Sequence, residues 1–155
     1  MQNFSEDYML EHVLAGELRL PAGEVPTPFV DADDLADVAV AALTDDRHIG
    51  QLYELTGPRS LTMAEAAAEI AQASGRRVRY VAVSLEEHAA EAAAHGVPPE
   101  VVELLTYLFR EVMDGRNAAT TDDVRRALGP DPRDFGDYAR AAAATGVWNG
   151  SAAAA

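Results

Sequence analysis

The sequence predicts an α/β fold that leans toward α+β, with about three short strands and six or seven helices. Two observations support this prediction. Apolar residues recur at helical spacing in several segments, and short runs rich in Val, Leu and Tyr lie between those segments. The chain of 155 residues is 48% hydrophobic and 25% charged, which is enough for one domain with its own core. We expect residues 1–148 to form that domain and residues 149–155 to be a flexible tail.

The N-terminal part predicts a helix and a strand. Ser5 is a suitable cap for a helix that runs to about Leu14, and Gly16 ends it. Leu18 and Leu20 then alternate with charged residues, which is typical of a short, half-buried strand before a proline.

The central stretch, residues 26–57, predicts a strand, a helix and a second strand. The first strand ends at Phe29 and Val30, and an acidic turn follows it. Apolar residues then repeat at helical spacing at Leu35, Val38, Ala39, Ala42 and Leu43. After Gly50, the segment Gln51–Leu55 alternates in a strand-like way and stops at Gly57.

Two capping boxes predict the starts of the next helices. Thr62 is followed three residues later by Glu65, and Ser84 is followed in the same way by Glu87. The first of these helices is expected to end near Ser74, and the second near Gly96. A strand, residues 78–83, lies between them.

The segment Glu100–Asp114 predicts the most apolar helix of the chain. Its apolar arc covers about half of the helix circumference, which is wider than the ~100° stripe of a plain surface helix. We therefore expect it to pack against two different surfaces. Two short helices follow, one led by Thr120 or Thr121 and the other from Asp134 to Thr145.

The composition argues against several classes of function. The formal net charge of −14 would repel polyphosphate backbones, so we expect no nucleic-acid partner. There is no cysteine and no apolar run long enough to span a bilayer, so we expect no disulfide, no membrane partner and a cytoplasmic location. His88, Glu91 and His95 share one helix face, but a solvated helix surface explains them better than a metal site does.

Two strings carry a resemblance to a known family. They are PFVDADDLADVAVAAL and GQLYELTGPRSLTMAEAAAEIAQASGRRVRYVAVS. Both resemble the NmrA-like group of atypical short-chain dehydrogenases/reductases, and the resemblance extends from Met1 to about Trp148. It implies that the chain matches only the C-terminal, substrate-binding half of a member, as a truncated Rossmann-like fold.

The sequence lacks two elements of reductase chemistry. No two glycines have the G-x-G spacing that lets a backbone approach a dinucleotide pyrophosphate. No lysine is present, so the Tyr-x-x-x-Lys pair of many short-chain reductases is absent. We therefore expect no cofactor-binding residues, and NAD(P)H binding only if a missing N-terminal half is supplied.

The candidate site residues come from the resemblance and from the apolar helix. The string QNF implies that Asn3 and Phe4 lie near the substrate. We also expect Phe29, Leu105, Tyr107, Phe109 and Met113 to line a pocket for an apolar small molecule. Ordinary packing is the alternative for each aromatic residue, and a pocket position for Phe109 predicts that Phe109→Ala weakens binding more than stability.

Three residues are candidate catalytic groups: Asp31, Asp34 and Tyr107. Clustered carboxylates can raise one another's pKa and so serve in acid/base chemistry. The alternative interpretation of both aspartates is capping of the helix that follows them.

Three functions are compatible with these observations. The first is a cofactor-independent small-molecule-binding protein or enzyme of the isomerase or cyclase type. The second is a non-enzymatic regulatory or partner-binding module, and the third is a C-terminal fragment of an NAD(P)H-dependent oxidoreductase. The strand edge at Gln51–Leu55 also predicts a homodimer, because exposed strand edges tend to pair.

Overall fold

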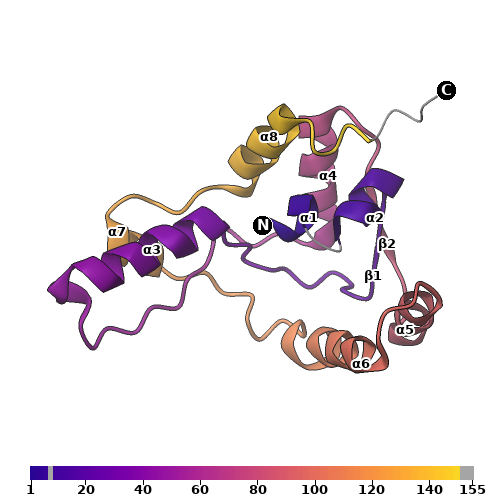
Figure 1. Cartoon of the computed structure of the whole chain (residues 1–155), viewed down its shortest axis with the longest axis horizontal. Helices are drawn as coiled ribbons and strands as arrows, with labels where there is room; N and C mark the ends of the chain where they lie inside the picture. The colour runs from indigo at the N-terminus through magenta and orange to yellow at the C-terminus, as the bar shows by residue number, and fades with distance from the viewer. Residues whose placement is uncertain (7–8, 151–155) are drawn as a thin grey trace.

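A computed structural model describes residues 1–6 and 9–150 (Figure 1). Within these ranges the fold is α/β, with eight α-helices and one small sheet. The helices are α1 Asn3–Glu6, α2 Met9–Ala15, α3 Ala32–Thr44, α4 Met63–Ser74, α5 Leu85–Ala94, α6 Pro99–Tyr107, α7 Asp123–Leu128 and α8 Phe135–Thr145. A 3-10 turn, Asp46–His48, follows α3, and a π-helical turn, Leu108–Val112, continues α6. None of the described helices has the length and apolar character that crossing a membrane requires.

The sheet consists of two parallel strands, β1 (Glu17–Leu20) and β2 (Arg79–Ala82). Leu18 pairs with Tyr80, and Leu20 pairs with Ala82. Leu18 and Leu20 are completely buried, as the alternating pattern of their strand predicts. Both strands were expected from the sequence, although β2 is shorter than the expected range of residues 78–83.

The core lies where α1, α4 and α8 meet. The alanine-rich sides of α4 and α8 pack against each other. Phe4 of α1 lies edge-on to both Phe29 and Phe135, with ring centroids 5.5 Å apart in each pair. The indole Nε1 of Trp148 donates a buried hydrogen bond to the carbonyl oxygen of Phe4 at 2.8 Å. The two ends of the described chain are therefore joined in one aromatic cluster.

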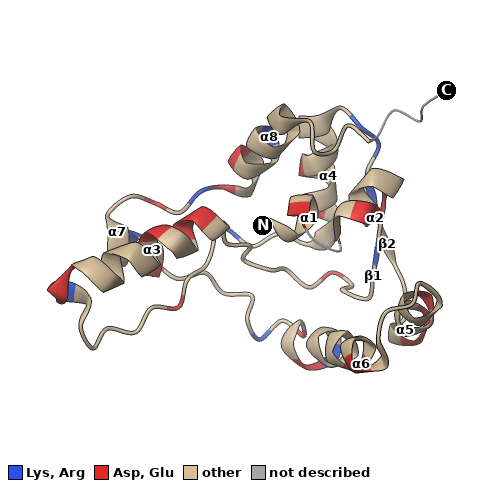
Figure 2. Cartoon of the chain, in the orientation of Figure 1, with Lys and Arg blue, Asp and Glu red and all other residues tan. Residues whose placement is uncertain are grey.

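Acidic side chains are spread over much of the molecule. Figure 2 shows Asp and Glu on α3, α5, α6 and other helices. Several of them are used locally, as the capping boxes of α4 and α5 show: Glu65 and Glu87 accept from the backbone N–H of Thr62 and Ser84. These two helix starts agree with the sequence prediction.

The expected number of strands is not confirmed. The segment 51–55 is extended but pairs with no strand among the described residues. The strand expected to end at Phe29 and Val30 is reduced to one antiparallel bridge between Thr27 and Leu61. A strand needs a partner along several residues; within the described part of the chain the first of these segments has none, and the second has only this single bridge.

Some helix bounds also differ from expectation. The first helix was expected from Ser5 to Leu14. Helical residues instead begin at Asn3 and continue, beyond residues 7 and 8, which lie outside the described part, to Ala15. The predicted helix Glu100–Asp114 is α-helical only to Tyr107 and then widens into the π turn. Most of the predicted tail, residues 151–155, lies outside the described residues.

Trp148 tests how strongly the two chain ends depend on each other. Trp148→Phe keeps most of the apolar volume but leaves the buried carbonyl of Phe4 without its donor. We expect a loss of about 1–3 kcal/mol in the free energy of unfolding. Trp148→Ala should lose more, about 3–5 kcal/mol, because it also leaves a cavity. Urea unfolding followed by circular dichroism measures both, and equal losses for the two variants would contradict the hydrogen-bond argument.

Candidate functional site

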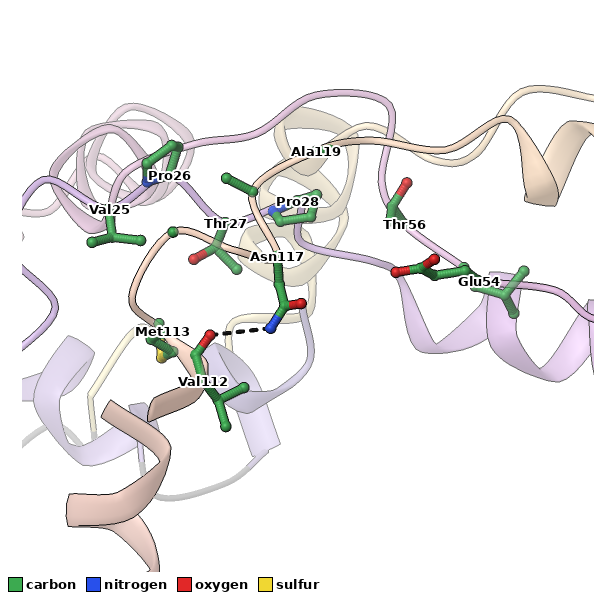
Figure 3. Close-up of a pocket in the computed structure, with 13 residues that line it drawn as sticks. Val25, Pro26, Thr27, Pro28, Glu54, Thr56, Val112, Met113, Asn117 and Ala119 are labelled. Atoms are coloured by element: carbon green, nitrogen blue, oxygen red, sulfur yellow. Dashed lines mark hydrogen bonds between the residues drawn. The ribbon is translucent and has the colours of Figure 1, made fainter. Parts of the chain in front are cut away.

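A mainly apolar pocket lies between three segments that are distant in the sequence (Figure 3). It has a volume of about 260 Å³. One wall comes from the loop after β1, a second from the extended segment after the 3-10 turn, and the third from the end of the π turn with the loop that follows. The lining residues include Val25, Thr27, Pro28, Glu54, Thr56, Val112, Met113 and Asn117.

Backbone hydrogen bonds hold the first two walls together. The N–H of Thr27 donates to the carbonyl of Leu61 at 2.9 Å, and the N–H of Leu61 donates back at 3.0 Å. The N–H of Gly57 donates to the carbonyl of Pro28 at 3.3 Å. A Cβ atom at Gly57 would lie only 2.0 Å from the carbonyl oxygen of Phe29, so this close approach requires glycine.

Side-chain hydrogen bonds attach the third wall to the second. The buried hydroxyl of Thr56 accepts from the N–H of Thr121 at 2.9 Å. The hydroxyl of Ser60 donates to the carbonyl of Ala118. The Asn117 amide nitrogen donates to the carbonyl of Val112 at 3.1 Å, as Figure 3 shows. Asn117 thereby fixes the end of the π turn beside the pocket.

The pocket offers few polar groups and one ionisable side chain, that of Glu54. The side-chain oxygens of Asn117 and Thr27 are further polar groups beside apolar walls formed by Val25, Pro28 and Met113. Such a lining suits an apolar ligand that is oriented by a few hydrogen bonds. Chemically, the site can bind and orient a molecule and exclude water, but its lining contains no general acid other than Glu54.

A second, wider pocket lies between α1, the start of α3 and α8, with a volume of about 790 Å³. Its polar groups are mostly engaged with one another. The Gln2 amide donates to Asp31 at 2.8 Å, and the hydroxyl of Tyr138 donates to Ser5 at 2.9 Å. Burial raises the pKa of Tyr138 to about 12, so this phenol stays protonated at neutral pH and is a weak proton donor.

The two candidate catalytic aspartates are buried and already have partners. Asp31 is the N-cap of α3 and accepts from the N–H of Asp33 at 2.9 Å. Asp34 forms an ion pair with Arg133 and accepts from the Arg133 backbone N–H at 2.8 Å. Both carboxylates therefore have structural partners, and a catalytic role for them stays a prediction.

The other predicted residues do not form one site. Asn3 is exposed at the start of α1, and Phe4 is buried beside Phe29 in the core. Leu105 is half-buried on α6, and the third catalytic candidate, Tyr107, is 57% exposed there.

Met113 and Phe109, at the end of the predicted apolar helix, have different surroundings. Met113 lines the smaller pocket, whereas Phe109 is buried in the core against the ring of His88, with centroids 5.2 Å apart. Of the residues predicted to bind substrate, Met113 is the one that lines this pocket.

Sequence reasoning missed most of the pocket. Val25, Pro28 and Asn117 lie in loops, where no periodic pattern marks a functional position. The one available signal was indirect, since Pro26 and Pro28 indicate a rigid, extended loop that runs beside another segment.

Gly57→Ala tests the close approach of the two pocket walls. The added methyl group would collide with the backbone of Phe29, and neither backbone can yield cheaply. We expect a loss of about 3 kcal/mol in the free energy of unfolding. Gly23→Ala is a suitable control, because Gly23 has φ +54° but open space around it, so only about 1–2 kcal/mol should be lost. Equal losses in chemical denaturation would contradict the assigned packing.

Phe109→Ala distinguishes a core residue from a pocket residue. Phe109 is only 6% exposed and packs on His88, so we expect the free energy of unfolding to fall by about 3–5 kcal/mol. The earlier expectation for an open cleft was a smaller loss. If the variant unfolds at nearly the same urea concentration as the unchanged protein, Phe109 is not a core residue, and its assignment to the surface of a cleft would be favoured instead.

The chain is similar to several oxidoreductases. It is 36% identical over 151 residues to the "Uncharacterized oxidoreductase YesF" of Bacillus subtilis, covering 96% of this chain and 53% of that protein. It is 38% identical over 129 residues to the "NAD(P)H azoreductase" of Xenophilus azovorans, covering 83% of this chain and 45% of that protein. The chain thus spans about half the length of the curated relatives it matches.

The fold has close structural neighbours. The triphenylmethane reductase of Citrobacter sp. matches with a TM-score of 0.79 at 23% identity, over 93% of this chain and 50% of that one. A structure of the same reductase complexed with NADP(H) matches with a TM-score of 0.78. At this level of identity, the likeness establishes a shared fold.

These findings overturn two expectations. A cofactor-independent binding protein or isomerase was the first functional hypothesis, and no cofactor was expected for the chain. Both are contradicted, because the relatives are named oxidoreductases and one is named for NAD(P)H. The absence of the G-x-G spacing was established only for the residues of this chain. The relatives are about twice as long. The alternative, part of an NAD(P)H-dependent oxidoreductase, fits better.

The model of the NmrA-like family matches residues 1–139, which is nearly all of the described chain. That the matched part corresponds to the C-terminal half of a family member stays a prediction. The match itself extends over most of the core, the pocket loops and both strands, and the chain therefore belongs to the NmrA-like family.

Proposed function

We propose that this chain is the C-terminal, substrate-binding part of an NAD(P)H-dependent reductase, and that the smaller pocket holds the electron acceptor. The observation that carries the proposal is the apolar lining of that pocket by Val25, Pro28 and Met113, beside the amide of Asn117. NAD(P)H, when bound, would supply the hydride.

The acceptor is a conjugated, apolar molecule. Relatives and neighbours are named for azo compounds, quinones and triphenylmethane dyes, which are all conjugated systems with a large apolar surface. An apolar lining favours such molecules by desolvation, and the walls keep water away from the reacting bond. The Thr27 hydroxyl and the amide Nδ2 of Asn117 orient the acceptor by donating hydrogen bonds to its carbonyl or azo group.

The dinucleotide phosphates do not fit the described residues. A pyrophosphate is held by unpaired N–H groups at a helix N-terminus and by closely spaced glycines. Here the first turns of α3, α4, α5 and α8 are occupied by capping side chains, and carboxylates stand in all four first turns. These negative charges would repel phosphate, so the phosphate-binding loop belongs to a segment outside this chain.

Acceptor binding by this chain tests the proposal. Titration with a quinone such as menadione, or with an uncharged azo compound such as azobenzene, should give saturable absorbance changes. Val25→Glu places a charge in the apolar wall and should weaken the affinity at least about tenfold, which corresponds to 1.4 kcal/mol. Asn117→Ala should weaken it less.

Leu104→Glu is the matched control for this titration. Leu104 is 55% exposed on α6 and does not line the pocket, so the same charge there should leave the affinity unchanged. Circular dichroism melting verifies that each variant is folded. Equal affinities for the Val25 variant and the control would refute the pocket as the acceptor site.

A further inference from the structure

The helices α5 and α6 form an arm that few buried side chains attach to the rest of the molecule. They pack against each other, and Figure 1 shows them apart from α4 and α8. All residues of both helices are described, and among them only His88 is buried, with 7% of its surface exposed. We call residues 85–107 the α5–α6 arm. The sequence suggested a solvated helix surface for His88, and the structure instead makes it the buried residue of the arm.

His88 attaches the arm to the π turn that leads into the smaller pocket. Its ring lies edge-on to the ring of Phe109, with centroids 5.2 Å apart and an angle of 70° between the planes. Phe109 belongs to the π turn, and Val112 and Met113 at the end of that turn line the pocket. The N–H of Met113 donates to the carbonyl of Leu108 at 2.9 Å, so the pocket wall is tied to the turn that carries Phe109.

The charged groups around His88 do not compensate a positive imidazole. Glu91 of α5 lies near His88 and near His12 of α2. Glu91 is already paired with Arg19 of β1, whose Nη2 lies 2.6 Å from Oε1 of the carboxylate. His12 adds a like charge when it is protonated. The π turn contributes two charged residues that are both exposed, Arg110 and Glu111. A proton on His88 therefore meets one carboxylate, and that carboxylate already has a partner.

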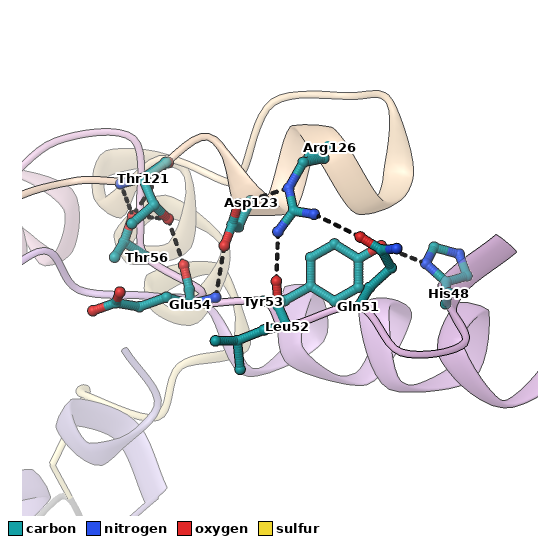
Figure 4. Close-up of polar contacts among 9 residues, drawn as sticks. All are labelled: His48, Gln51, Leu52, Tyr53, Glu54, Thr56, Thr121, Asp123 and Arg126. Atoms are coloured by element: carbon teal, nitrogen blue, oxygen red, sulfur yellow. Dashed lines mark hydrogen bonds and ion pairs between the residues drawn. The ribbon is translucent and has the colours of Figure 1, made fainter.

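A second buried histidine provides a contrast. His48 lies in the turn before the second wall of the pocket, and its Nδ1 is 2.7 Å from the hydroxyl of Tyr53 (Figure 4). Its Nε2 accepts from Nε of Arg47 at 3.1 Å, so both ring nitrogens have partners. No hydrogen bond to a ring nitrogen of His88 is recorded among the described residues, and the ring packs on Phe109. A protonated His88 is therefore a buried charge without a protein acceptor, which is costly.

These surroundings set the direction in which pH acts on the arm. Burial lowers the pKa of His88 below its ordinary value, His12 lowers it further, and Glu91 opposes the shift. The docked arm thus binds fewer protons than an arm with His88 in water. By linkage, docking is firmest above the ordinary histidine pKa of about 6.5 and weakens as the pH falls below it. The ratio of released to docked arm can rise at most about tenfold for each pH unit below that value.

We propose that the α5–α6 arm is a pH-sensitive clamp on the third wall of the smaller pocket: it is docked on Phe109 while His88 is neutral, and it is released when His88 is protonated. Release frees the π turn, and Val112 and Met113 then no longer form a fixed apolar wall. Acidification thereby weakens acceptor binding without any change in the acceptor itself. The proposal rests on the proposed function only in naming an electron acceptor as the ligand of the pocket.

Amide exchange of this chain at pH 7.5 and pH 5.5 tests the clamp. Exchange rates at residues 109–118, corrected for the intrinsic effect of pH, should rise severalfold at the lower pH, and by about tenfold at most. They should also exceed the corrected rates in α4, because the arm is released while the core stays folded. Rates at 109–118 that equal those of α4 at pH 5.5 would show global unfolding in place of a local release, and the clamp would be refuted.

Three histidine variants assign the effect to one side chain. His88→Phe keeps an aromatic ring against Phe109 but cannot titrate, so the rise in exchange should disappear. His95→Gln is the matched control, because His95 is exposed at the end of α5 in the same arm. His48→Gln removes the other buried histidine. Both of these variants should keep the pH dependence. A dependence that persists in His88→Phe, or that is lost in His48→Gln, would contradict the proposal.

A measurement on the unchanged protein covers the case in which His88→Phe does not fold. In NMR titrations the imidazole of His88 should have a midpoint below pH 6.5, and the amide signals of Val112 and Met113 should shift with the same midpoint.

Saturation with menadione, which carries no charge, should lower this midpoint further, because binding favours the docked arm. A midpoint at or above 6.5, or pocket amides that do not follow His88, would overturn the clamp. A shared midpoint without menadione binding would leave the clamp standing and count against the acceptor site. Menadione binding that leaves the midpoint unchanged would leave the acceptor site standing and refute the clamp.

Discussion

The pairing of residues 27–28 with residues 57–61 is the constraint on which the rest of the structure depends. Three backbone hydrogen bonds close a long loop at this point, and Gly57 allows the two strands of chain to approach. On one side of the closure, Phe29 and Leu61 pack into the core. On the other side the loop carries α3 and the segment 51–56 outward, and the pocket forms at the closure itself. One set of contacts therefore positions the core, the smaller pocket and α3.

Local signals in the sequence were sufficient wherever a local interaction determines the structure. The capping boxes at Thr62 and Ser84 mark helix starts because each box satisfies N–H groups within four residues. The alternation of Leu18 and Leu20 marks β1 because both side chains face the core. The strand predicted at Gln51–Leu55 depends instead on a partner strand that is distant in the sequence. Its pattern is strand-like, but no strand among the described residues pairs with it, and no local pattern reveals whether a partner is at hand.

The candidate site could be predicted only in part, for a related reason. Met113 belongs to a segment with a periodic apolar pattern, and its position on the helical wheel places it at the edge of the wide apolar arc. Phe109 has the same apolar character, but the π turn that begins at Leu108 changes the helical spacing, and Phe109 is buried against His88 of α5. Asn117 and Val25 sit in loops whose positions follow from contacts with Thr56 and Leu61, far away in sequence. Such residues become visible only when the folded chain brings their loops together.

In α3 the sequence pattern and the observed burial disagree, because the apolar side of the helix is exposed. The helical spacing of Leu35 and Leu43 predicts the helix, and apolar residues at this spacing ordinarily face the core. The structure instead exposes both while burying Asp34. A charged residue is rarely buried unless it is paired, and here Arg133 supplies the pair. The inward side of α3 is thus stabilised by an ion pair specific to this position, and its apolar side is left exposed. Full burial of a Val or Leu side chain contributes roughly 1.5–3 kcal/mol, and a large part of that is not realised for Val40 and Leu43, which are 60% and 86% exposed. That free energy is unused among the described residues, because none of them covers these side chains.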